Sequence, residues 1–98
     1  MRRREYPIRL TINGRQITKV IIDPHYELKH SSSVSDTVIL DLVRMLAGSS
    51  FEPECEAGNY QYFVSDNLVL GTKRYKLIWL LEKDELFIGV VNAYRRRK

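Results

Sequence analysis

The chain has 98 residues, of which 44% are hydrophobic, and this predicts one folded domain over residues 1–98 rather than two small domains or a disordered segment. Sixteen Lys and Arg face twelve Asp and Glu, and seven of these cations lie in Arg2–Arg4 and Arg95–Lys98, so the basic charge belongs to the two ends. The sequence has no apolar run of about 20 residues, which argues against a membrane span. It has only one cysteine, which argues against a disulfide framework. We therefore expect a cytoplasmic protein whose basic ends, residues 1–5 and 95–98, fray in water.

The first predicted element is a β-hairpin. Residues 8–12 and 15–23 favour strands, and Asn13-Gly14 separates them. Asn-Gly is the strongest short signal for a hairpin, because both central residues of a type I′ turn need positive φ. Asp23-Pro24 then ends the second strand, since proline has no N–H for the strand ladder.

A helix is predicted over residues 35–47. Ser33 or Ser35 supplies the N-cap, and Gly48 is a natural stop after the last turn. Between them, apolar residues recur at helical spacing and form one stripe. The stripe consists of Val38, Ile39, Leu42, Val43 and Leu46.

The rest of the chain predicts strands. Segments rich in β-branched and aromatic residues occupy 60–64, 68–70, 75–81 and 86–94, with short turns between them. Short connections join antiparallel neighbours. The predicted fold class is therefore α+β: an antiparallel sheet of about five strands in the order ββ-α-βββ, with one main amphipathic helix packed on it.

The last predicted strand, residues 86–94, is apolar on both faces, which is typical of a central strand that is covered on both sides. Alternation predicts that Asn92 and Tyr94 share the face of Ile88 and Val90. The strand leads directly into cations, which suits the binding of a polyanion, RNA or DNA. The predicted substrate-binding residues at this end are Asn92, Arg96, Arg97 and Lys98. The alternatives are that Asn92 only satisfies a neighbouring backbone group and that the tail only keeps the protein soluble.

Aromatic residues in the later strands have two interpretations. They could stack on bases of a nucleic acid, or they could pack in the core. The residues concerned are Tyr60, Tyr62, Phe63 and Trp79.

Both histidines, His25 and His30, lie in the segment HYELKH with Lys29 between them. Histidine transfers protons near neutral pH, and lysine stabilises the extra charge on a pentacoordinate phosphate, as RNA cleavage through the 2′-OH requires. Such cleavage needs no metal ion, and the sequence has neither metal-ligand spacing nor a cofactor-binding motif. The alternative is that both histidines are exposed loop residues.

Three parts of the sequence resemble a family of small bacterial toxins. They are His25-x-x-x-Lys29 followed by Ser35-Asp36, the strand Gly58–Tyr62, and the closing hairpin of Tyr75–Trp79 and Gly89–Tyr94. In these parts the chain is similar to the barnase/colicin/RelE-like superfamily, whose members include basic, metal-independent ribonucleases of toxin–antitoxin pairs. The opening hairpin departs from the N-terminal helical hairpin of RelE and ParE, which weakens transfer of their ribosome- and gyrase-directed activities.

The resemblance implies roles for individual residues. His25 would be the general acid or base, and Lys29 and Arg95 would be the cations that hold the phosphate or its transition state. Tyr94 and Asn92 would position the substrate. Apart from the resemblance, His30 is predicted to be a substrate-binding residue. The resemblance also implies a protein partner, an antitoxin that covers the basic face.

The sequence thus predicts a metal-independent endoribonuclease toxin that acts on RNA and has no cofactor. Two alternatives stay open. One is a non-catalytic nucleic-acid-binding module that uses the tails and the aromatic strands. The other is a protein-interaction domain, such as an inhibitor or adaptor.

Overall fold

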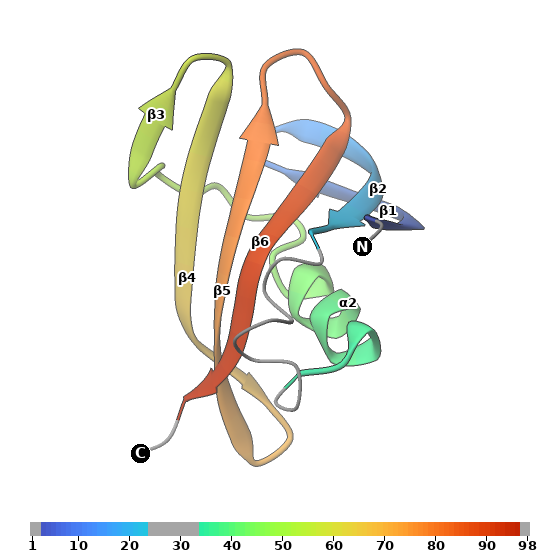
Figure 1. Cartoon of the computed structure of the whole chain (residues 1–98), viewed down its shortest axis with the longest axis vertical. Helices are drawn as coiled ribbons and strands as arrows, with labels where there is room; N and C mark the ends of the chain where they lie inside the picture. Colours follow the sequence, from blue (N-terminus) through green and yellow to red (C-terminus); the bar gives the residue numbers. More distant parts are fainter. Residues whose placement is uncertain (1–2, 24–33, 97–98) are drawn as a thin grey trace.

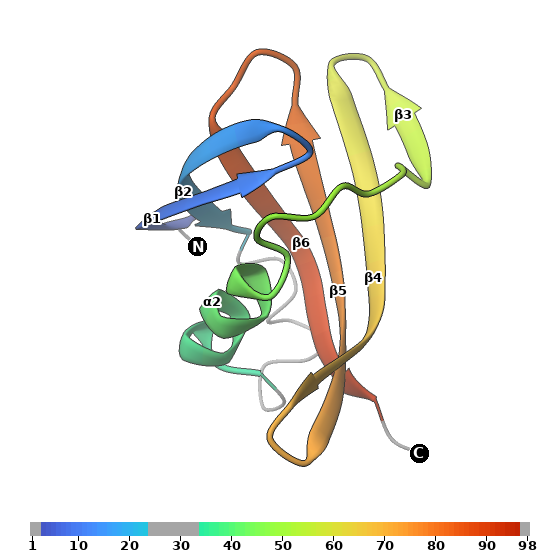
Figure 2. The same ribbon diagram turned by 180° about the vertical axis from the view of Figure 1, so that it is seen from behind.

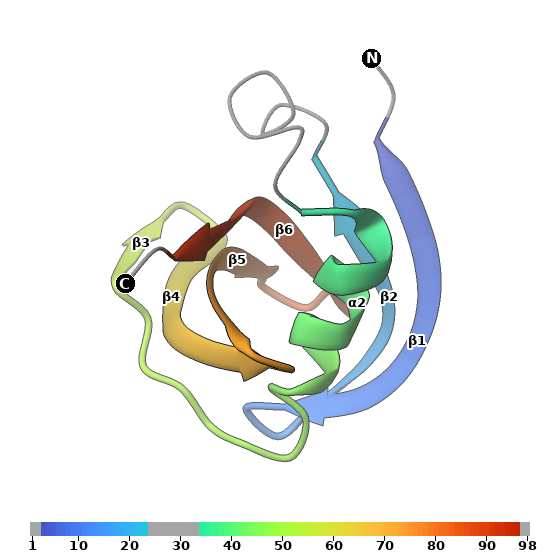
Figure 3. The same cartoon turned by 90° about the horizontal axis from the view of Figure 1, so that it is seen from below.

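Six strands form one sheet in the computed structural model, which describes residues 3–23 and 34–96 (Figure 1). The strand order is β1-β2-β6-β5-β4-β3, and all neighbours are antiparallel except β2 and β6, which are parallel. The sheet curls around helix α2, which lies on its concave side (Figures 2 and 3). The elements are β1 (Arg4–Ile12), β2 (Arg15–Ile22), α2 (Asp36–Arg44), β3 (Cys55–Ala57), β4 (Tyr60–Leu70), β5 (Lys73–Glu82) and β6 (Phe87–Arg96).

The predicted opening hairpin is confirmed. Strands β1 and β2 pair on either side of Asn13 and Gly14, which have φ of 53° and 71°. Positive φ at both turn positions is what the Asn-Gly pair supplies at low cost. Strand β1 is an edge of the sheet, and Pro7 and an irregularity between Pro7 and Leu10 interrupt its ladder. Such interruptions are common on edge strands.

Helix α2 begins where the sequence places its cap but ends earlier. The Ser35 hydroxyl accepts a hydrogen bond from the Val38 N–H at 3.3 Å, which is the geometry of an N-cap. The helix was expected to reach residue 47 and ends at Arg44, because the chain then tightens into i to i−3 bonds, including Ala47 N–H to the Arg44 carbonyl at 3.2 Å.

The core lies between α2 and the concave face of the sheet. Trp79 is fully buried, its ring stacks on Phe63 with centroids 4.1 Å apart, and it makes a T-shaped contact with Phe51 with centroids 5.4 Å apart. The indole N–H donates to the Ser65 hydroxyl at 3.0 Å. The core interpretation of Trp79 and Phe63 is therefore confirmed, whereas Tyr60 is 38% exposed.

Replacing Trp79 by alanine should remove a large part of the stability. A fully buried aromatic side chain replaced by alanine costs about 3–5 kcal/mol, through lost burial and the cavity left behind. Urea unfolding followed by circular dichroism measures the change, with Val64→Ala on an exposed position of β4 as the control. A loss below about 1 kcal/mol, well short of a core truncation, would show that Trp79 does not hold this core together.

The predicted fold class is wrong. Strands make up 61% of the described residues, the sheet has six strands rather than about five, and it is mixed rather than antiparallel. Helix α2 spans only nine residues, so the protein is mainly β rather than a helix layer on an antiparallel sheet. The physical reason is that the chain does not continue from β2 to an adjacent strand. It passes through α2, β3, β4 and β5 first, and the last strand, β6, then pairs parallel with β2.

The predictions about the last strand and about the two ends of the chain have different outcomes. The last strand is central, as predicted, because β6 pairs with β2 on one side and β5 on the other. The predicted fraying of residues 1–5 and 95–98 is wrong for Arg4, Glu5, Arg95 and Arg96, which lie in β1 and β6.

Candidate nucleic-acid interface

The start of β5 and the end of β6 form a cluster that we call the basic end, made of Arg74, Lys76, Tyr94, Arg95 and Arg96. Because the two strands are antiparallel, the first residues of one meet the last residues of the other. Arg74 is opposite Arg96, and Lys76 is opposite Tyr94. The cations at the end of β6 therefore lie beside Arg74 and Lys76 from the preceding strand, β5.

A β-bulge decides which face of the sheet carries Tyr94 and Arg96 of this cluster, whereas Arg95, opposite the buried Tyr75, lies on the other face. Trp79 pairs with Val90 and Ile78 pairs with Asn92, so Val91 is an extra residue in β6. Buried Val90 faces α2, whereas Asn92 and half-buried Ile78 lie on the opposite, outer face. The prediction that Asn92 and Tyr94 share the face of Val90 is therefore wrong, because the bulge reverses the alternation.

Charges at the basic end are unequally neutralised. Arg96 donates to the Asp66 carboxylate at 2.9 Å, so part of its charge is compensated. The Lys76 ammonium lies 5.8 Å from the centroid of the Tyr94 ring, within the range of a cation–π contact. Arg74 and Arg95 are exposed. The result is a cationic surface that holds an aromatic ring in place.

Asn92 carries the one buried side-chain oxygen that lacks a hydrogen-bond partner within the described ranges. A buried acceptor without a partner costs about 1–3 kcal/mol, so such atoms often mark a place where function outweighs stability. Asn92 directly precedes the basic end on the outer face, two residues from Tyr94. The sequence interpretation that Asn92 satisfies a neighbouring backbone group is not supported for this oxygen.

The remaining predicted site residues lie outside the described residues. These are His25, Lys29, His30, Arg97 and Lys98. The described chain on the N-terminal side stops at Asp23, whose backbone N–H donates to the Val90 carbonyl at 3.1 Å. Asp23 therefore lies next to β6, the strand that carries Asn92 and Tyr94.

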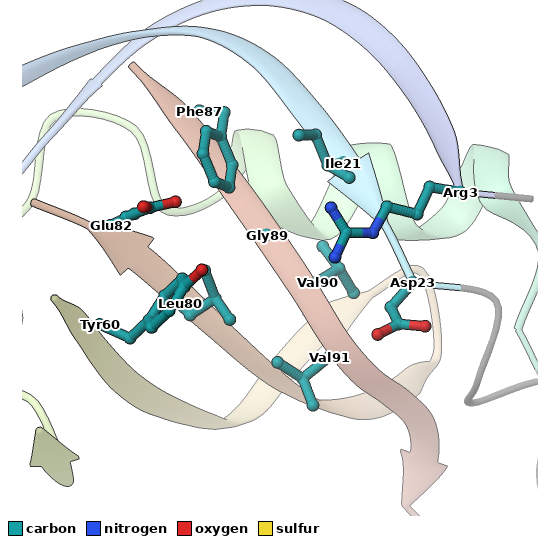
Figure 4. Close-up of a pocket in the computed structure, with 10 residues that line it drawn as sticks. All are labelled: Arg3, Ile21, Asp23, Tyr60, Leu80, Glu82, Phe87, Gly89, Val90 and Val91. Atoms are coloured by element: carbon teal, nitrogen blue, oxygen red, sulfur yellow. The ribbon is translucent and has the colours of Figure 1, made fainter. Parts of the chain in front are cut away.

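A hollow of about 90 Å³ opens on the outer face, at the first half of β6 (Figure 4). Gly89 lies in register between Ile21 on β2 and Leu80 on β5, and the Leu80 side chain packs over it, 2.8 Å from where a Cβ on Gly89 would lie. Figure 4 shows Phe87 on one side of Gly89. Tyr60, which belongs to β4, lies beside Leu80. Sequence reasoning missed this hollow, because only the strand pairing brings its residues together.

The polar groups of the hollow carry both signs of charge. The guanidinium of Arg3 and the carboxylate of Asp23 stand at one rim, and the carboxylate of Glu82 stands at the other (Figure 4). Glu82 is opposite Tyr60 in the β4–β5 ladder, which places both on the outer face.

A second polar cluster ties the N-terminal strand to α2. Arg4 donates two hydrogen bonds to the Asp36 carboxylate, at 2.5 and 2.9 Å, and the Tyr6 hydroxyl donates to the same carboxylate. The Arg4 guanidinium holds the pKa of Asp36 below its usual value, and the Asp36 carboxylate raises the pKa of Tyr6. This cluster is a structural contact that fixes the start of the helix against β1.

Asp36→Asn should lower stability at neutral pH by about 1–3 kcal/mol, because the pair is a part-buried, charge-assisted hydrogen bond. The folded protein keeps Asp36 ionised more readily than the unfolded chain does. The contribution is therefore fully present above the unfolded pKa of about 3.9 and is lost as pH falls through the lower folded pKa. Urea unfolding of parent and variant between pH 2 and 7 measures this. A gap between the two that stays constant down to pH 2 would contradict it.

Residues 3–23 and 34–96 contain neither a metal centre nor a membrane-spanning helix. These ranges contain no group of three or more His, Cys, Asp or Glu side chains placed to hold a metal ion. They also contain no helix that is long and apolar enough to cross a membrane. Comparison of the chain with protein-family models, curated proteins and solved structures gives no match.

Proposed function

We propose that this protein binds single-stranded RNA at the basic end and cleaves it without a metal ion, in the manner of a toxin from a toxin–antitoxin pair. The observation that supports binding best is the register of β5 and β6. It places Arg74 and Lys76 beside Tyr94 and Arg96 on one face of the sheet. Cations that contact phosphates, next to a ring that can stack on a base, are the usual components of a single-strand site.

The position of these groups favours a single strand over a duplex. Tyr94 is half-buried and the Lys76 ammonium lies over its ring, and an aromatic ring beside a cation is the kind of platform that binds unstacked bases. A base inside a duplex is stacked on both sides and does not offer its ring. The cations contribute without regard to sequence, because they contact the phosphate backbone.

Cleavage is supported by the path of the chain. Asp23, two residues before His25 in the sequence, donates its backbone N–H to the Val90 carbonyl of β6 at 3.1 Å. In the proposed reaction, His25 removes a proton from the 2′-OH or donates one to the leaving 5′-oxygen. Lys29 and Arg95 stabilise the charge on the phosphate, and the products are a 2′,3′-cyclic phosphate and a free 5′-OH.

The test is to incubate the purified protein with mixed RNA in EDTA and to analyse the products by mass spectrometry. Fragments with 2′,3′-cyclic phosphate ends support the full proposal. RNA that is bound but intact reduces it to a non-catalytic binding module. RNA that is neither bound nor cut overturns it and favours a protein-interaction domain. Growth arrest on expression, relieved by a small protein encoded next to it, would support the toxin part separately.

A further inference from the structure

We propose that β4 binds an extended, acidic segment of another protein, which adds a strand to the sheet along the part of β4 that β3 leaves uncovered. We call this part, residues 63–70, the open edge. The inference does not rest on the RNA-binding function proposed above. It rests on the backbone of β4, on two exposed valines and on the cations that lie beside them.

Strand β4 is covered along only part of its length. Strand β3 pairs with Tyr60–Tyr62 and then ends, whereas β4 continues to Leu70 (Figure 1). In the described parts of the chain, no other strand pairs with β4 on that side. The opposite edge strand, β1, contains Pro7 and an irregular ladder, which are common protections against an added strand. The open edge contains no proline.

The backbone groups of two valines point to the open edge. The Tyr62 carbonyl accepts a hydrogen bond from the Glu54 N–H at 2.7 Å, on the side of β3. Because backbone groups alternate between the two sides of a strand, the N–H and C=O of Val64 point to the same side as those of Tyr62. Leu70 pairs with β5 across a two-residue turn, so the groups of Val69 point away from β5. Within the described residues, neither valine has a hydrogen-bond partner on this side.

The same two valines have exposed apolar side chains. Val64 is 40% exposed and Val69 is 51% exposed. Val64 is opposite Ile78 and Val69 is opposite Arg74, which places both valines on the outer face, on either side of the bulge in β4. An added strand would bond to the backbone of both valines and cover both side chains, as in other cases of strand addition. Because the bulge interrupts the ladder, we expect a reversible complex rather than a permanent one.

The charges beside the open edge favour an acidic occupant. Lys73 and Arg74 pair with the last two residues of β4, and both are exposed. The Asp66 carboxylate is already paired with Arg96 at 2.9 Å. A second copy of this chain would bring two such sets of cations together, and like charges repel. A nucleic acid lacks the row of N–H and C=O groups that a strand edge requires. A protein segment with Asp or Glu side chains matches both the backbone and the charge.

The probe is a synthetic peptide of alternating glutamate and valine, and the control peptide has lysine in place of glutamate. Titration of ¹⁵N-labelled protein with the acidic peptide should shift the amide resonances of Val64 and Val69 and slow their exchange with solvent. The lysine peptide should bind at least about tenfold more weakly, because like charges oppose it. Equal affinity for the two peptides would show that the partner is not selected by its acidic charge, and the inference would be wrong.

The backbone contact is tested by proline. Val64→Pro should weaken binding of the acidic peptide at least about tenfold, because proline removes the outward N–H and leaves the ladder to β5 intact. Val64→Thr keeps this N–H and is the matched control, which should change the affinity by less than about threefold. Val69→Pro blocks the open edge at a second place, and circular dichroism checks that each variant keeps the parent's fold.

Three results would overturn the inference. Unchanged peptide binding in both proline variants would show that charge alone holds the peptide. Slow amide exchange at Val64 and Val69 in the free protein would show that the open edge is already paired. Failure of the acidic peptide to bind at low salt would show that the edge accepts no strand. RNA binding by Val64→Pro should equal that of the parent, so the proposed function is tested separately.

Discussion

The triple variant Arg74→Gln, Lys76→Gln, Arg95→Gln is expected to bind single-stranded RNA about 100-fold more weakly than the parent at 0.1 M salt. Each phosphate contact adds about 0.7 to the slope of log K against log salt for a single strand, so three contacts account for a slope of about 2. The variant should therefore show a flatter salt dependence, and the two proteins should converge towards 1 M salt. Fluorescence anisotropy across a salt series measures both quantities.

The control for this variant has the same charge change elsewhere. Arg9, Lys19 and Lys83 lie in β1, β2 and the turn between β5 and β6, away from the basic end, and all three are exposed. Replacing these three by glutamine should change affinity by less than about fivefold. If the control loses as much affinity as the triple variant, binding depends on net charge and not on the arrangement at the end of β5 and β6.

The second large effect is expected at His25. General acid–base catalysis contributes about 10²–10⁴-fold to a rate, so His25→Ala should slow RNA cleavage by at least about 100-fold. Single-turnover cleavage of a labelled RNA measures the chemical step. The variant should keep the parent's circular dichroism spectrum and its RNA affinity, since the proposed role is proton transfer rather than binding.

The histidine assignment has its own control. His30→Ala removes the second histidine of the same segment, for which the sequence predicts only a binding role. It should raise the RNA concentration needed for half-maximal cleavage more than it lowers the rate at saturation. Cleavage by His25→Ala at the parent's rate would remove His25 from the mechanism. The binding function would be unaffected.

Local signals in the sequence predicted local structure well. The Asn13-Gly14 turn and the Ser35 cap depend on a few neighbouring residues, so their chemistry identified them. The central position of β6 followed from its apolar faces. The parallel pairing of β2 with β6 could not be predicted in this way, because it depends on residues 60 or more positions apart that no local pattern connects.

The candidate site was only partly predictable for the same reason. Tyr94 and Arg96 were identified from the end of the last strand, but their partners Lys76 and Arg74 come from the strand register. The face they occupy depends on the bulge at Val91, and no residue type in that stretch predicts a bulge there. The hollow at Gly89 needs four strands side by side, so it becomes visible only in the fold.

The most direct test of RNA binding at the basic end is a titration of ¹⁵N-labelled protein with a single-stranded RNA octamer, followed by amide chemical shifts. The largest shifts are expected at Arg74–Lys76 and Asn92–Arg96, and the turn at Asn13 and Gly14 should not change. Saturable shifts confined to these two segments would support the proposed site. Shifts confined to the β1–β2 hairpin or to β3, or none at all in low salt, would contradict it.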